Sequence, residues 1–147
     1  AVCCLSSVNA EKFMEWRDHP TFVEDVMRFL DNVLQDFIDR APPEMERAIY
    51  AAMRERSVGL GLMGYHSFLQ RQGVPMESAM AKVWNNKIFR HIRRGADAAS
   101  VKLAQERGAC PDAASTPKPK AAPWARSTCL TQRPPPRRLA ADAAATA

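Results

Sequence analysis

The sequence predicts a mostly helical fold followed by a disordered C-terminal tail, and three observations support this prediction. Residues 22–40 and residues 76–107 repeat apolar side chains at the three- and four-residue spacing of amphipathic helices. From residue 115 onward this periodicity is lost, and the segment holds six of the eleven prolines. We therefore divide the chain into a folded part, residues 1–114, and a tail, residues 115–147.

The first segment, residues 1–9, is apolar and rich in residues that favour strands, without a helical period. It predicts a short buried strand or the end of one. Residues 11–20 read as a connector that ends at His19-Pro20, because the residue before a proline avoids the helical region.

The helix predicted over residues 22–40 has one wide apolar face. Thr21 is the expected N-cap, and Glu24 has the spacing of a capping box. Pro42-Pro43 ends the helix. Its opposite, exposed face is expected to carry the acidic residues Glu24, Asp25, Asp31, Asp36 and Asp39.

Three shorter elements follow. A second helix is predicted over residues 44–54, then an extended glycine-containing segment over 57–62, then a short helix over 65–70 that closes near Gly73. The inner positions expected for the second helix are Met45, Ala48, Ile49 and Met53.

The long helical region runs from about residue 76 to residue 107. Asn85-Asn86 or Gly95 could divide it, because these residues lower helix propensity. Gly108 is a natural C-terminal cap, with Pro111 just beyond. The apolar stripe expected to be buried consists of Met80, Val83, Trp84, Ile88, Phe89, Ile92, Ala96, Ala99 and Leu103.

The net charge of +5 belongs to the tail. Residues 1–114 hold 15 basic and 15 acidic residues, whereas residues 115–147 hold six basic residues and one acid. The sequence therefore predicts no nucleic-acid binding by the folded part. The alternative function is a non-enzymatic helical interaction module whose basic tail touches nucleic acid, with salt-dependent binding that disappears when the tail is removed.

Several classes of protein are disfavoured by the residues present. The sequence shows no secretory signal and no apolar stretch long enough for a membrane helix, which favours a cytoplasmic chain. Four cysteines are too few for a disulfide framework, and no cysteine or histidine spacing fits zinc. His19, His66 and His91 are expected to be structural or surface residues, and the basic run 90–94 a solvated helix face, with phosphate binding as its alternative.

The glycine segment Gly59-Leu60-Gly61-Leu62-Met63-Gly64 matches the dinucleotide-binding pattern G-x-G-x-x-G. Its context does not fit that fold, because a predicted helix precedes it and no acidic residue follows at the required distance. We expect these glycines to allow close packing of the backbone instead.

Three segments are informative when taken together: Ala-Val-Cys-Cys-Leu-Ser-Ser-Val-Asn (1–9), Arg-Glu-Arg-Ser-Val-Gly-Leu-Gly-Leu-Met-Gly (54–64), and a long helix ending in Gly-Ala-Cys-Pro (108–111). In this order they resemble the catalytic (large) subunit of ribonucleotide reductase. The resemblance covers about residues 1–114. It implies a fragment of the family's ten-stranded α/β barrel, in which Cys110 is a buried packing residue.

The resemblance also implies a role for Cys3. In this family the corresponding cysteine belongs to a redox pair that reduces ribonucleotides to deoxyribonucleotides during thiyl-radical chemistry. The resemblance therefore implies that the Cys3 sulfur lies at the floor of a sugar-binding cavity, next to the glycine segment. Cys4 is expected to face the other way along the strand. On the segment alone, the alternative is that Cys3 and Cys4 are inert apolar residues. Cys3 is the one predicted catalytic residue, and neither cofactor-binding nor metal-binding residues are predicted in this segment.

Other parts of the family's machinery have no counterpart in the sequence. These are the Asn-x-Cys-x-Glu radical segment, the cysteine that pairs with Cys3, the Pro-Thr-x-Ser phosphate loop and the C-terminal cysteine pair. We therefore expect the isolated chain to be inactive. The tail resembles a GC-rich gene translated out of frame, which we state as a hypothesis.

The resemblance further implies partners and cofactors. They are a ribonucleotide substrate, a radical-generating small subunit that contains metal, and thioredoxin or glutaredoxin, within a homodimer of the full subunit. The first segment favours the oxygen-dependent class that acts on diphosphates. The adenosylcobalamin-dependent class, with similar segments, is the alternative.

Overall fold

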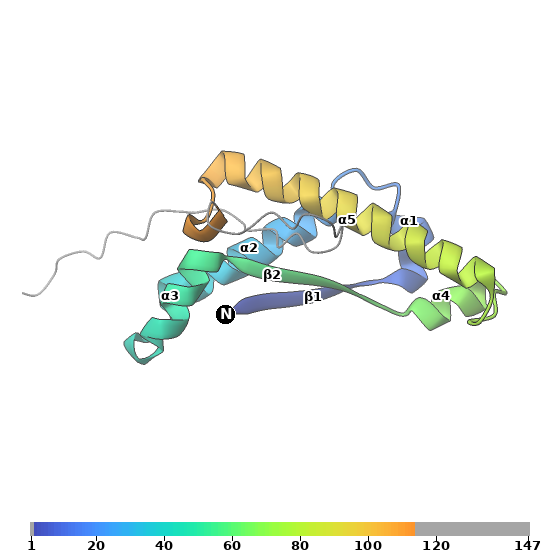
Figure 1. Ribbon diagram of the computed structural model, residues 1–147, viewed down its shortest axis with the longest axis horizontal. Coiled ribbons are helices and arrows are strands. Elements are labelled where there is room, and N and C mark those ends of the chain that lie inside the picture. The colour runs from blue at the N-terminus through green and yellow to red at the C-terminus, as the bar shows by residue number, and fades with distance from the viewer. Residues whose placement is uncertain (1, 114–147) are drawn as a thin grey trace, which may run out of the picture.

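The computed structural model describes residues 2–113, in which two parallel strands carry helices on one face (Figure 1). The strands are β1 (Cys3–Asn9) and β2 (Ser57–Met63). The helices are α1 (Phe13–Trp16), α2 (Phe22–Arg40), α3 (Glu46–Glu55), α4 (Tyr65–Arg71) and α5 (Ala79–Arg107), with short 3-10 turns at Ala10–Lys12, Pro43–Met45 and Pro111–Ala113. The predicted tail, residues 115–147, lies outside the described residues.

The two strands pair in parallel, from Cys3 opposite Ser57 to Asn9 opposite Met63. Parallel neighbours need a crossover connection, which α2 and α3 supply. Successive side chains of a strand point to opposite faces, so residues 4, 6 and 8 of β1 face the helices and residues 3, 5 and 7 face away. The strand prediction is confirmed, but only Val8 of β1 is fully buried.

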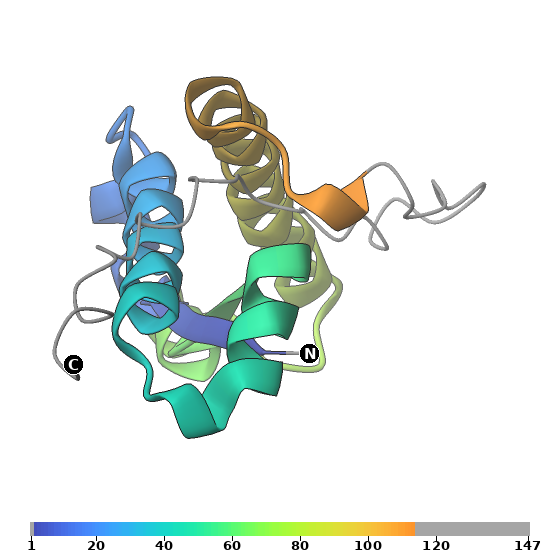
Figure 2. The ribbon, with the colours of Figure 1, turned by 90° about the vertical axis from the view of Figure 1, so that its left-hand side faces the viewer.

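Helices α2 and α5 lie side by side over the sheet, and α3 crosses one end of it (Figure 2). Leu34 and Leu103 are fully shielded from solvent in this layer. Gly95 lies at a close contact between the two helices, because a Cβ there would be 2.8 Å from the Cβ of Val23. Gly95 therefore sits at a helix–helix contact and does not divide α5, which is continuous.

The connector after β1 contains a helical turn, α1, that the sequence pattern did not predict. Phe13 is 1% exposed, and the Trp16 indole donates a hydrogen bond to the Asn9 carbonyl at 2.8 Å. The Phe13 ring meets those of Trp16 and Phe68 edge to face. These aromatic rings form the core beneath the carboxyl ends of the strands.

The start of α2 differs from the prediction. Thr21 is the N-cap residue but makes no capping hydrogen bond, because its hydroxyl donates to Asp25 at 2.8 Å. Glu24 is held by Arg28 and Lys102, so the capping box is not formed.

Other predicted exposures are also wrong. Asp31, expected on the polar face, is completely buried. Four residues expected to be inner positions are instead exposed: Met45, Met80, Val83 and Phe89. Met45 lies in the 3-10 turn before α3, and the covered face of α5 is narrower than its apolar stripe. Within residues 2–113, no helix has the length and hydropathy to cross a membrane.

Helix α5 begins at Ala79, three residues later than predicted, with Ser78 as its N-cap. The C-terminal ends of α4 and α5 agree with the sequence. Helix α4 closes at Gly73, which has a φ of 65°. Gly108 caps α5, and the chain turns back through Pro111. Cys110 is buried, as predicted.

Candidate functional site

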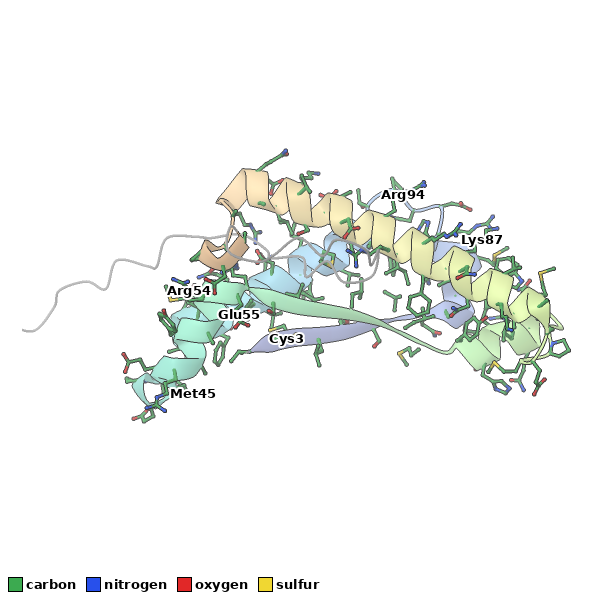
Figure 3. The ribbon with its side chains drawn as sticks, viewed as in Figure 1. Cys3, Met45, Arg54, Glu55, Lys87 and Arg94 are labelled. Atoms are coloured by element: carbon green, nitrogen blue, oxygen red, sulfur yellow. The ribbon has the colours of Figure 1, made fainter. Side chains whose placement is uncertain are left out.

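The candidate site is the face of the sheet opposite α2 and α5, where no described helix packs (Figures 1 and 3). From β1 it presents Cys3, Leu5 and Ser7, all exposed. From β2 it presents Gly59 and Gly61, which alternate with residues that pack on the helices. We call this surface the open face.

Cys3 and Cys4 occupy opposite faces of β1, as predicted. The Cys3 thiol is exposed on the open face, where its sulfur makes a weak contact with the Cys4 carbonyl at 3.6 Å. Cys4 packs against the core cluster that contains Leu34 and Ile38. Burial, with a further contribution from the charge of Cys3, raises the pKa of the Cys4 thiol above its usual value. Cys4 is therefore the less reactive of the two thiols.

The glycines of β2 make room for the side chains of β1. A Cβ on Gly59 would be 2.5 Å from the Leu5 Cδ2 and 3.8 Å from the Cys3 sulfur. A Cβ on Gly61 would be 2.9 Å from the Ser7 hydroxyl oxygen. The expectation that these glycines serve close packing is confirmed, and the glycine stretch adjoins Cys3.

The glycine pattern does not form a dinucleotide-binding turn. Gly59 and Gly61 lie inside β2 itself, whereas that turn follows a strand. Only Gly64 is in the left-handed region, with a φ of 70°, and it precedes α4. A Cβ there would be 2.4 Å from the Asn9 side-chain oxygen, which already accepts a hydrogen bond from the Glu11 amide.

Cys3 was predicted to lie at the floor of a cavity, but its side chain is exposed in this structure. The reason is that a two-stranded sheet with helices on one side cannot enclose its other side. Cys3 lies next to the glycine segment, as predicted. Residues 2–113 do not form the predicted cavity around its thiol.

A buried polar network, which no sequence pattern predicted, lies at the start of β2. Arg56 is 2% exposed, and its guanidinium donates to both Asp31 and Gln35 of α2. Arg107, near the end of α5, donates to the same aspartate and to Asn32. The only sequence signal was an arginine directly before the glycine segment, which by itself gives no indication of burial.

The histidines do not form a site. His19 and His66 are exposed, and His91 is half-buried against the Phe13 and Trp16 rings. No group of three His, Cys, Asp or Glu side chains suited to a metal occurs within residues 2–113.

The basic run on α5 lines an open groove of about 480 Å³. Lys87, Arg90 and Arg94 border it, and the Lys87 ammonium lies 4.8 Å from the centre of the Trp84 ring. The solvated-face interpretation agrees with these exposed cations.

Comparison with known proteins shows the family. The family model for the ribonucleotide reductase barrel domain matches residues 1–134. This match extends beyond residue 114, where the resemblance of the motifs ends. The large subunit of the ribonucleoside-diphosphate reductase from Invertebrate iridescent virus 6 is 46% identical over 116 residues, which are 79% of this chain and 12% of that protein.

Two further relatives are more distant. The vitamin B12-dependent ribonucleoside-diphosphate reductase of Mycobacterium tuberculosis is 34% identical over 115 residues, covering 74% of this chain and 16% of that protein. The solved class Id ribonucleotide reductase alpha subunit of Actinobacillus ureae has a TM-score of 0.75 and 34% identity, over 89% of this chain and 24% of that one.

The chain thus spans less than a quarter of the length of each of these relatives. Within that span, the strand with Cys3, the glycine strand and the long helix occur in the order that the motifs predicted. The chain belongs to the ribonucleotide reductase family, and it corresponds to part of the barrel domain of the large, catalytic subunit.

Proposed function

We propose that this chain supplies one thiol of the redox pair with which a ribonucleoside-diphosphate reductase reduces its substrate. The observation that carries the proposal is the placement of Cys3 on the open face, beside glycines that leave the sulfur uncovered. Cys4 supports the assignment by contrast, because it faces the helices and its pKa is raised by burial.

The proposed reaction conserves atoms and electrons. Two thiols, Cys3 and a partner outside this chain, give up two protons and two electrons and become a disulfide. The ribonucleotide accepts them, loses its hydroxyl as water and becomes a deoxyribonucleotide. The disulfide is then returned to two thiols by thioredoxin or glutaredoxin.

The other requirements of the reaction lie outside residues 2–113. A metal-containing small subunit would generate the radical, with adenosylcobalamin as the alternative source. The described residues do not fit a metal centre, because they hold no suitable group of ligands, and we assign them no step of the radical chemistry. The full subunit would act as a cytoplasmic homodimer.

A chimera tests the proposal. Residues 1–113 replace the matching segment in the large subunit of the iridescent virus relative, and deoxynucleotide formation is measured with its small subunit and thioredoxin. Cys3→Ser should abolish turnover with thioredoxin, because serine cannot form a disulfide. Cys4→Ser is the matched control on the other face and should retain most activity.

The outcomes separate the alternatives. Equal activity of Cys3→Ser and the parent chimera would show that Cys3 is an apolar surface residue and not a reductant. The isolated 147-residue chain should form no deoxynucleotide under the same conditions, because it holds one thiol of the pair.

A further inference from the structure

The sequence of β2 leaves its own register underdetermined. Val58, Leu60 and Leu62 pack on the helices, and Gly59 and Gly61 alternate with them on the open face. A slip of one residue would bury glycines and expose the aliphatic side chains. A slip of two residues would keep every glycine and nearly every aliphatic side chain on its own face, so the hydrophobic pattern alone does not exclude it.

Arg56 immediately precedes this strand and has an unusual backbone conformation. It ends α3 with a φ of 43°, in the left-handed region, and its amide donates to the Ala52 carbonyl at 3.0 Å. Glycine is the common residue at this position of a helix terminus, since a side chain is strained there. An arginine at such a position, 2% exposed, indicates that its side chain offsets the strain.

The side chain of Arg56 is bound at three of its nitrogens. Its Nε and Nη2 donate to the Oδ1 of Asp31 at 3.1 and 2.6 Å, and its Nη1 donates to the Gln35 side-chain oxygen at 2.8 Å. Arg107 of α5 holds the second oxygen of the same carboxylate. A buried guanidinium fits these acceptors at one position along α2, and moving it would leave the buried charge of Arg56 unpaired.

The residue after Arg56 is Ser57, which lies directly opposite Cys3. We propose that Arg56 is a positioning residue: its bonds to α2 hold β2 in the register that places Ser57 and Gly59 beside the Cys3 thiol. The catalytic consequence rests on the proposed function. At the far end of β2, Gly64 only avoids a clash with Asn9 and supplies no comparable attraction.

Cross-linking in the 147-residue chain tests the register. Ser57→Cys is introduced together with Cys4→Ser, and the disulfide to Cys3 is followed by peptide mapping during oxidation with diamide. Neighbours in register are within bridging distance, whereas a two-residue slip moves the partner by about 6.6 Å. Adding Arg56→Gly, which also relieves the backbone strain, should slow the cross-link about tenfold, because the thiols then meet only in a minor register.

Two comparisons separate positioning from general stability. Arg28→Gln breaks the exposed Arg28–Glu106 pair between α2 and α5 without touching β2, and should leave the cross-linking rate unchanged. Asp31→Asn removes the charge that holds Arg56 and should slow the reaction like Arg56→Gly, which covers the case in which one variant fails to fold. Circular dichroism identifies the folded variants. A parental cross-linking rate in either folded network variant overturns the proposal.

The reductase readout is independent of the cross-link. In the chimera, Arg56→Gly should lower kcat about tenfold with little change in KM, because the substrate still binds while the thiol is misplaced. If the parent chimera makes no deoxynucleotide but the cross-link still depends on Arg56, the proposed function fails and the register inference stands. An unchanged kcat in a reductase-active Arg56→Gly chimera would overturn the catalytic part of the inference.

Discussion

The two faces of the β1–β2 sheet have opposite chemistry within the same fourteen residues. The face toward α2 and α5 carries Cys4, Val8, Val58, Leu60 and Leu62, which pack into the cores of the helical layer. The open face carries a thiol, an exposed leucine, a serine and two glycines, of which none is fully buried. One face therefore determines whether the segment folds, and the other is available for chemistry.

The largest expected effect comes from truncating one leucine on each face of the sheet to alanine, which tests whether only the helical face contributes to stability. Leu34 of α2 is 0% exposed and belongs to the cluster on which Cys4 packs, so Leu34→Ala should cost about 2–5 kcal/mol of unfolding free energy. Leu5 is 77% exposed on the open face, and Leu5→Ala should change stability by less than about 0.5 kcal/mol. Urea titrations of both variants measure the difference. Similar losses would show that the open face also contributes to the core.

The second test concerns the contact between the two covering helices. Gly95→Ala adds a methyl group at 2.8 Å from the Val23 Cβ and forces α2 away from α5. Overpacking costs about 1–3 kcal/mol, against a gain in helix propensity of about 1 kcal/mol. We expect a net loss of up to about 2 kcal/mol by thermal unfolding.

The control for that substitution lies on the same helix. Asn86 is exposed on α5, so Asn86→Ala changes helix propensity without adding a contact and should stabilise the chain by about 0.5 kcal/mol. If Gly95→Ala also proves stabilising, the helices are not in close contact there.

The periodicity of apolar residues predicted the helices, but it did not predict which residues contact each other across the fold. The spacing of apolar residues identified both long helices, and the cysteine segment identified the first strand. The sequence predicted an exposed Asp31, because an aspartate on an amphipathic helix usually faces solvent. Its partners Arg56 and Arg107 are 25 and 76 residues away, and no local pattern connects them.

The candidate site shows the same division. Motif resemblance predicted Cys3 and its glycine neighbours, because both lie within short contiguous segments. It did not predict the solvent exposure of the thiol, since enclosure depends on other strands. Likewise, Met80, Val83 and Phe89 are apolar and have the spacing of a buried helix face. They are exposed because the rest of the fold covers only part of α5.

A smaller effect should appear in acid, and it should follow the ion pairs of the helical layer. Hydrogen bonds from Lys102 and Arg28 lower the pKa of Glu24, and Arg28 lowers the pKa of Glu106, both below the ordinary value of 4.5. A lowered folded-state pKa stabilises the protein above the ordinary value, and this contribution is lost as the pH falls through the folded-state pKa.

The measurement is the urea midpoint between pH 6 and pH 3, a range that brackets the ordinary glutamate pKa of 4.5. Glu106→Gln should flatten the decline below pH 4.5, because one of the two stabilised carboxylates is gone. Glu77→Gln is the control, since Glu77 is exposed and forms no ion pair among residues 2–113. A decline that is identical in all three proteins would assign the acid sensitivity to other groups.

The smallest effect on stability should come from Gly59→Ala, although the new Cβ lies only 2.5 Å from Leu5. The contacted atom is the end of a flexible side chain that is 77% exposed, so Leu5 can rotate outward into solvent. Alanine also reduces the freedom of the unfolded chain, which offsets part of any strain. We expect the free energy of unfolding to change by less than about 0.5 kcal/mol in a urea titration. The effect of Gly95→Ala should be larger, because the Cβ of Val23 is fixed to the backbone and cannot rotate away. A loss as large as that of Leu34→Ala would mean that Leu5 is held in place, and the two faces of the sheet would then not divide folding from chemistry.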